Sequence, residues 1–160
     1  MYISGWPQLF IHTGAALFLI ALAGSAFFVP QLRPMHTFQG LIYVAVIVLA
    51  LKASPWGYGA GVVIATFWNS LSLFVTHLIQ AGAGQLVSLL RTGHVDRPDT
   101  LMVMIGGVGH FLLIIGCLAA FLRQRPNGRK WAEFFGGAVL CLAYFALIVR
   151  LFLPGAFGRH

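Results

Sequence analysis

Hydrophobic positions gather into five long runs along the chain, separated by short segments that hold prolines and most of the charged residues. The runs cover residues 9–29, 38–51, 57–82, 101–122 and 131–153. Apolar stretches of about 20 residues are typical of α-helices that cross a bilayer. The pattern therefore predicts an all-α fold, a polytopic transmembrane helical bundle with five spans.

The second run is shorter than a typical span. Residues 38–51 follow two prolines, Pro30 and Pro34, which we expect to end the first helix. A stretch of this length is at the lower limit for crossing a bilayer as a helix. The alternative is four spans plus a short re-entrant or tilted segment at 38–51.

The third run has no sharp end. The glycines of the AGAG stretch at 81–84 weaken a helix, so residues 85–91 are expected either to lie in the membrane interface or to extend the span. The longest polar stretch, at 91–100, is too short to fold by itself. Residues 1–160 are therefore predicted to form a single integral-membrane domain.

Composition supports this fold class. Hydrophobic residues make up 59% of the chain and charged residues only 8%, whereas about a quarter of a typical soluble domain is charged. The net charge of +7 comes from ten Lys and Arg against three acidic residues. Because these basic residues lie between the apolar runs, their predicted partners are anionic lipid headgroups and not nucleic acid.

The basic residues divide evenly between the two predicted membrane faces. One face holds Lys52, Arg123, Arg125, Arg129 and Lys130, and the other holds Arg33, Arg91, Arg97, Arg150 and Arg159. Four of the first group are concentrated in the loop at 123–131, and positively charged loops favour the cytoplasmic side. We therefore expect the N-terminus and this loop to be cytoplasmic, in a multi-pass protein of a cytoplasmic or inner membrane.

The few acidic residues exclude several enzyme classes. No Asp or Glu lies in a predicted membrane interior, since Glu133 stands at the entrance of the fifth run. Carboxylate-driven pumps, aspartyl intramembrane proteases and metal-dependent lipid phosphotransferases need such groups. Ser70 and His77 also lack an acidic third member for acyl transfer. A non-catalytic or electron-transfer membrane subunit is therefore favoured over a stand-alone enzyme.

The third run carries a group of polar residues with helical spacing. On a helical wheel, Thr76 and Gln80 fall within about 20° of Asn69, and Ser72 falls near 60°. Thr66 falls near 60° on the other side, and Ser70 and His77 lie farther around the same half of the wheel. If residues 66–80 form one continuous helix, this face must point inward, because an unpartnered amide in hydrocarbon is costly. Two interpretations stay open, namely hydrogen bonds between helices and a surface for a ligand or solute.

Histidines suggest a second hypothesis. His77 and His110 flank the loop at 91–97 with nearly equal spacing, so two antiparallel helices would hold them at similar depth. Paired buried histidines ligate b-type haem in membrane four-helix bundles, and His12 is a further candidate ligand. A copper site that also uses Met102 and Cys117, or histidines that are only hydrogen-bonded, are the alternatives.

The loop between the third and fourth runs holds the last group of candidates. Arg91, His94 and Arg97 are placed to contact an anionic headgroup or a quinone carbonyl. The alternative is that the charges of this loop pair with one another.

Three functions follow from these patterns. The first is a haem b electron-transfer or cofactor-holding subunit of a larger membrane complex, and the second is a structural subunit without a cofactor. The third is a small-solute carrier or channel that uses the polar face of the third run. Small-residue clusters at 57–61, 106–109 and 136–138 predict close helix contacts, within the bundle or with another subunit in a complex or homo-oligomer.

Overall fold

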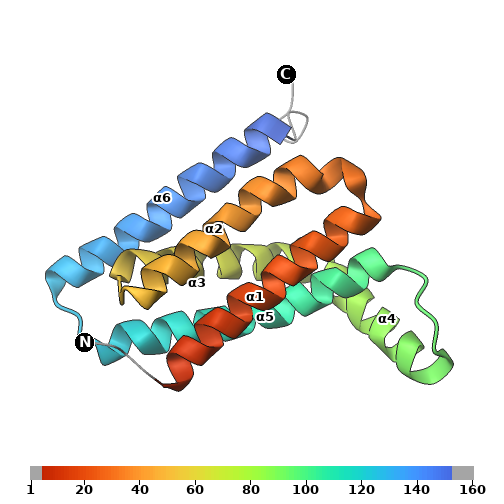
Figure 1. Cartoon of the computed structure of the whole chain (residues 1–160), viewed down its shortest axis with the longest axis horizontal. Helices are drawn as coiled ribbons and strands as arrows, with labels where there is room; N and C mark the ends of the chain where they lie inside the picture. Colours follow the sequence, from red (N-terminus) through yellow and green to blue (C-terminus); the bar gives the residue numbers. More distant parts are fainter. Residues whose placement is uncertain (1–4, 153–160) are drawn as a thin grey trace.

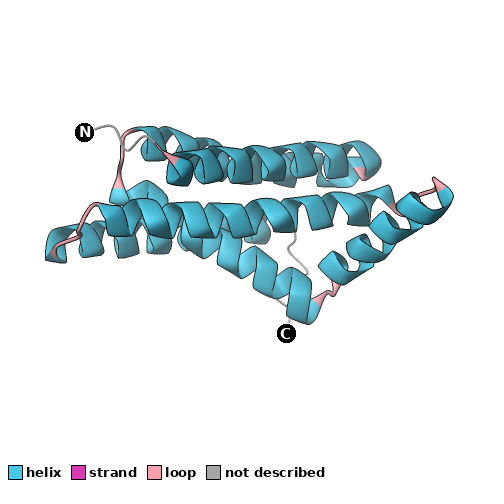
Figure 2. Cartoon of the chain, turned by 90° about the horizontal axis from the view of Figure 1, so that it is seen from below, coloured by secondary structure: helices cyan, strands magenta, loops and turns pink. Residues whose placement is uncertain are grey.

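The protein is predominantly helical over residues 5–152, the part of the chain that this computed structural model describes (Figure 1). No strand occurs among these residues, as the view coloured by secondary structure also shows (Figure 2). A 3-10 turn, η1 (Pro30–Leu32), precedes the second helix, and a π-helical turn, η2 (Leu71–Val75), follows the third. The six α-helices are α1 (Trp6–Phe28), α2 (Arg33–Leu51), α3 (Pro55–Ser70), α4 (Leu78–Thr92), α5 (Pro98–Arg123) and α6 (Gly128–Phe152).

Five helical units are long and apolar enough to cross a membrane, which confirms the predicted number of spans. They are Trp6–Phe28, Pro30–Leu51, Pro55–Val75, Pro98–Arg123 and Gly128–Phe152. The second unit is longer than the predicted run at 38–51, because its helical structure already begins at Pro30. Proline is tolerated in the first turn of a helix, where its missing N–H has no partner to lose.

One end of the bundle is tied by hydrogen bonds between segments that are distant in the sequence. At one end Gln124 Nε2 donates to the carbonyl of Ala53 at 2.7 Å, and Gln8 Nε2 donates to Ala50 at 3.0 Å. This end joins the start of α1, the α2–α3 turn and the α5–α6 loop, while the α1–α2 turn and the α4–α5 loop lie at the other end (Figure 1). This arrangement is the one expected when successive helices cross the membrane in alternating directions.

Glycines allow two helix pairs to touch along their backbones. A Cβ on Gly14 of α1 would lie 2.5 Å from the carbonyl oxygen of Gly109 in α5. Between α3 and α6, a Cβ on Gly59 would collide with the Phe134 carbonyl, and one on Gly137 with the Trp56 carbonyl. The small-residue clusters therefore make close helix contacts inside the bundle, as predicted.

The predicted continuous helix over residues 66–80 is wrong. The chain passes through η2 and turns at His77, whose φ of 54° is left-handed, before α4 begins at Leu78. From this point α4 diverges from the bundle and packs on the first turns of α5 (Figures 1 and 2). Residues 85–91 belong to α4 and do not extend the third span.

Side chains near this break satisfy carbonyl groups that the interrupted helix leaves without their usual partners. The Thr76 hydroxyl donates to Leu71 O at 3.3 Å, and Gln80 Nε2 donates to Leu73 O at 2.7 Å. The Thr76 N–H also bonds Leu71 O, at 2.9 Å. In a hydrocarbon environment, where water is scarce, such replacement bonds make a broken helix tolerable.

Candidate functional site

A cavity of about 90 Å³ lies inside the bundle between α1, α2, the end of α3 and α5. Its wall combines apolar side chains, among them Phe18, Leu22 and Met102, with a set of hydrogen-bonding groups. Among the described residues that line it, none is Asp, Glu, Lys or Arg, so the cavity is polar without formal charge. The polar lining residues are Ser25, His36, Gln39, Trp68, Asn69, Ser72 and His110.

His110 is fixed on one side of this cavity by a chain of hydrogen bonds. The side-chain amide of Asn69 donates to Gly107 O at 3.3 Å, so its Oδ1 accepts from His110 Nδ1 at 3.1 Å. His110 Nε2 then accepts from the Tyr43 hydroxyl at 2.8 Å. The Phe18 ring stacks on the imidazole at a centroid distance of 4.0 Å. An uncharged imidazole with its proton on Nδ1 satisfies both partners, so both ring nitrogens of His110 are occupied.

Gln39, unlike His110, is buried without hydrogen-bond partners among the described residues. Its side chain is 1% exposed, yet neither Oε1 nor Nε2 has a hydrogen-bond partner within residues 5–152. His36 Nδ1 and Trp68 Nε1 are also buried without a partner there. A buried polar group without a partner costs about 1–3 kcal/mol. Four such atoms therefore belong to residues that line this one cavity.

The size of the cavity restricts the groups that it can hold. A water molecule occupies about 30 Å³ in the liquid, so the space suits a few waters or one small polar group. Gln39 supplies both a donor and an acceptor, whereas the indole N–H of Trp68 can only donate. A hydroxyl, carbonyl or amide group matches this set, and an ionised group does not, because no opposite charge compensates for its desolvation.

The structure separates the polar residues predicted to share one inward face. Asn69 and Ser72 are buried, at 4% and 6% exposure, and line the cavity. Thr76 and Gln80 lie beyond η2, are exposed, and bond to backbone carbonyls of the break. The shared inward face was wrong because it required an unbroken helix. Three further members of the predicted face, Thr66, Ser70 and His77, are also exposed.

The predicted haem ligands are not assembled in this geometry. His77 is exposed at the start of α4, His110 is buried, and His12 belongs to the first half of α1, before the cavity-lining residues of that helix. A metal ligand needs a free imidazole lone pair, but His110 Nε2 accepts from Tyr43 and its Nδ1 carries the proton given to Asn69. The residues as arranged do not fit haem, and its ligation stays a prediction that requires Tyr43 to move away.

The arrangement of the residues does not support a copper site with thiol and thioether ligands either. Met102 lines the cavity, but Cys117 packs towards Gly61 of α3, where its Sγ would be 2.8 Å from an added Cβ. Within residues 5–152, no group of three or more His, Cys, Asp or Glu side chains is placed to hold a metal ion.

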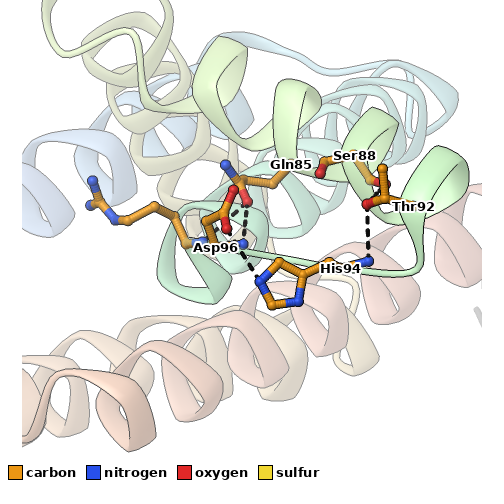
Figure 3. Close-up of polar contacts among 6 residues, drawn as sticks. Gln85, Ser88, Thr92, His94 and Asp96 are labelled. Atoms are coloured by element: carbon orange, nitrogen blue, oxygen red, sulfur yellow. Dashed lines mark hydrogen bonds and ion pairs between the residues drawn. The ribbon is translucent and has the colours of Figure 1, made fainter.

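The loop between α4 and α5 is held together by its own polar groups (Figure 3). Gln85 Oε1 accepts from the backbone N–H of Asp96 at 2.9 Å and of Arg97 at 3.1 Å. His94 Nε2 lies 3.3 Å from Asp96 Oδ1, and Arg97 forms two bonds with the Asp99 carboxylate, at 2.8 and 3.1 Å. The geometry thus favours the alternative of internal pairing. Contact of Arg91, His94 and Arg97 with a headgroup or quinone stays a prediction.

Sequence reasoning missed Gln39, His36, Tyr43 and Trp68 as members of the site. A usable signal was present for Gln39, because it is an isolated amide among apolar residues at 38–51, and such residues usually face the interior of a bundle. The two aromatic residues carry no such signal, since Trp and Tyr are common throughout membrane helices.

Comparison of the chain with protein-family models, curated proteins and solved structures finds no match.

Proposed function

We propose that this integral-membrane protein binds a small, uncharged hydrogen-bonding group in the cavity beside His110. The observation that carries the proposal is Gln39, whose almost fully buried amide has neither its donor nor its acceptor satisfied within the described chain. Natural proteins seldom leave such groups without a partner, so a guest in the cavity is the simplest means of satisfying them.

The two sides of the cavity have different roles in this proposal. His110, Asn69 and Tyr43 form a closed hydrogen-bond chain, so they shape the wall and keep the imidazole neutral. Gln39 and Trp68 have unused hydrogen-bonding capacity and are the groups that contact the guest. The protein is accordingly a binding or carrying component, with no group in the cavity assigned to acid–base catalysis.

Trp68 provides a direct reporter for the test. We would label the protein with 5-fluorotryptophan, place it in lipid nanodiscs, and assign the Trp68 fluorine resonance by its loss in Trp68→Phe. Three probes of equal chain length are compared, namely octanol, octanoate and octane. We expect octanol to shift the Trp68 resonance, because its hydroxyl both donates and accepts, and we expect octanoate and octane to leave it unchanged.

Gln39→Leu should abolish the octanol shift, and Gln31→Leu is the matched control. Gln31 is exposed in η1 and outside the cavity lining, so its replacement should leave the response intact. An equal shift with octane would show that the cavity is only an apolar void. Absence of any octanol shift in the wild-type protein would contradict the proposed function.

Haem ligation by His77 and His110 has its own test, an absorption spectrum of the purified protein. Bound haem b gives a Soret band, which should disappear in both His77→Ala and His110→Ala if the two histidines are the axial ligands. A protein with no such band, before and after haem is added, contradicts the haem prediction and leaves the proposal above untouched.

A further inference from the structure

A second hollow borders the cavity on the lipid-facing side of the bundle. It is a groove of about 500 Å³ between α1 and α2, close to the turn that joins them. The groove is deep because small residues line it, among them Ala23, Ala26 and Gly40. A Cβ on Gly40 would make only an ordinary contact, 3.5 Å from a Leu19 methyl group, so this wall has space beside it.

Only two side chains belong to both hollows. Leu22 of α1 and His36 of α2 line the groove and the cavity alike. His36 Nδ1 is one of the buried nitrogens without a partner. These two side chains therefore form part of the wall between the groove and the cavity.

The groove is lined by residues of two helical units that are long and apolar enough to cross a membrane. It lies along two of the spanning units, Trp6–Phe28 and Pro30–Leu51, and Phe27 at its edge is 72% exposed. An occupant that enters here comes from the bilayer and carries an apolar chain. The cavity behind it selects an uncharged polar end, since none of its described lining residues is charged.

We infer that the ligand is an uncharged single-chain amphiphile whose polar head occupies the cavity and whose chain lies in the α1–α2 groove. This inference rests on the proposed function and adds the chemical class of the ligand. The head passes between Leu22 and His36 and bonds to Gln39, while the chain remains on the lipid side.

Arg33 at the end of the groove points to a rival occupant, an anionic lipid with its phosphate on the guanidinium. The Arg33 side chain already has a structural partner, because its Nε donates to the Ala26 carbonyl at 3.1 Å near the end of α1. Basic side chains commonly satisfy the last carbonyls of a helix in this way. The uncharged amphiphile is favoured because it also accounts for the unpartnered groups of the cavity.

The test compares a long and a short alcohol on the fluorine-labelled protein in nanodiscs. Octanol fills both spaces, whereas ethanol needs only the cavity. Gly40→Leu fills the groove from α2, and Ala23→Leu fills it from α1. We expect each variant to weaken the octanol response at least threefold and to leave the ethanol response within a factor of two. Ala143→Leu, at an exposed position of α6, is the control and should change neither.

The outcomes separate the two proposals. If neither alcohol shifts Trp68 in the wild-type protein, the proposed function itself fails. If both alcohols keep their full effect in Gly40→Leu and Ala23→Leu, the cavity binds alcohols but the groove holds no chain, and the inference is overturned. Loss of both responses in both variants also overturns it, because the groove then has no separate role.

A further experiment changes the lipid composition of the nanodiscs, in order to test the anionic lipid as the occupant of the groove. Raising the share of phosphatidylglycerol in the nanodiscs from none to half should leave the octanol affinity within a factor of two. A fall of threefold or more would indicate that an anionic lipid competes for the groove at Arg33, which would replace the uncharged amphiphile as its occupant.

Discussion

At the scale of single residues, burial has opposite consequences for the two most buried polar side chains of the site. His110 and Gln39 are each 1% exposed. His110 is fully hydrogen-bonded to Tyr43 and Asn69, so it adds rigidity at little cost. Gln39 has no partner within the described chain, so it lowers stability unless a guest completes its bonds. Such an imbalance is typical of binding sites.

Replacement of Tyr43 by Phe tests the His110 network. The substitution keeps the ring but leaves Nε2 of a buried imidazole without a donor, so we expect the free energy of unfolding to fall by about 1–3 kcal/mol. Tyr144→Phe is the matched control, because the Tyr144 hydroxyl donates to Phe38 O at 3.3 Å at an exposed position. Thermal unfolding in one detergent would compare them. Equal losses in the two variants would contradict the role assigned to His110.

At the scale of helices, two features decide the shape of the bundle. Close contacts through glycine bring α1 against α5 and α3 against α6, and the break after η2 sends α4 away from the axis of α3. From the polar group of the third run, only Asn69 and Ser72 reach the cavity. Thr76 and Gln80 lie beyond the break, and the residues of this group on α3 at positions 66 and 70 are exposed.

The break depends on Gln80 for one replacement hydrogen bond. Gln80→Leu removes the donor to Leu73 O, so we expect a loss of about 0.5–1.5 kcal/mol in stability and faster amide hydrogen exchange around residues 71–80. Gln31→Leu again controls for the loss of an exposed glutamine. Unchanged exchange around the break would mean that the packing of α4 on α5 holds it without this bond.

A pair of glycine substitutions tests the helix contacts. Gly59→Ala places a methyl group against the Phe134 carbonyl, and we expect overpacking to cost about 1–3 kcal/mol. Gly84→Ala has no neighbouring atom within 4 Å, so helix propensity should make it neutral or stabilising by up to about 1 kcal/mol. Thermal unfolding of both variants measures the difference. A neutral Gly59→Ala would show that α3 and α6 can separate freely.

At the scale of the whole molecule, five spanning helices place the two ends of the bundle on opposite sides of the membrane. The α2–α3 turn and the α5–α6 loop share one end, and the α1–α2 turn lies at the other. Both native cysteines, Cys117 and Cys141, are buried in the bundle. Exposed cysteines introduced in the turns can therefore report the orientation.

Labelling with a membrane-impermeant maleimide checks the predicted orientation. With a cytoplasmic N-terminus, Gln31→Cys should react in intact cells, and Lys52→Cys should react only after the membrane is permeabilised. Both native side chains are exposed, in η1 and in the turn after α2. Labelling of both positions from the same side would contradict five spans, and the reverse pattern would show that the charged 123–131 loop faces outward.

Much of the fold could be predicted from the sequence, and less of the site. The spans follow from runs of apolar residues, and the glycine contacts follow from small-residue clusters, both of which are local features. The second span was predicted too short because Pro34 was taken to end a helix, although it lies in the first turn of α2. The break at 71–77 was missed because the spacing of Thr76, His77 and Gln80 agrees with a continuous helix. The same polar side chains are equally suited to bond the free carbonyl groups at a helix end, so the sequence does not distinguish the two cases.

By itself, the sequence determined that the chain is a polytopic helical membrane protein with uncharged polar groups in its interior. Hydropathy and the lack of acidic residues in the span interiors are properties of each segment alone. Only the tertiary structure decided which polar groups meet. Tyr43 and Asn69 reach His110 from 67 and 41 residues away, and Gln39 faces a cavity that no single helix forms. Such contacts depend on helix rotation and packing, which are set by the other helices and leave no periodic pattern in the chain.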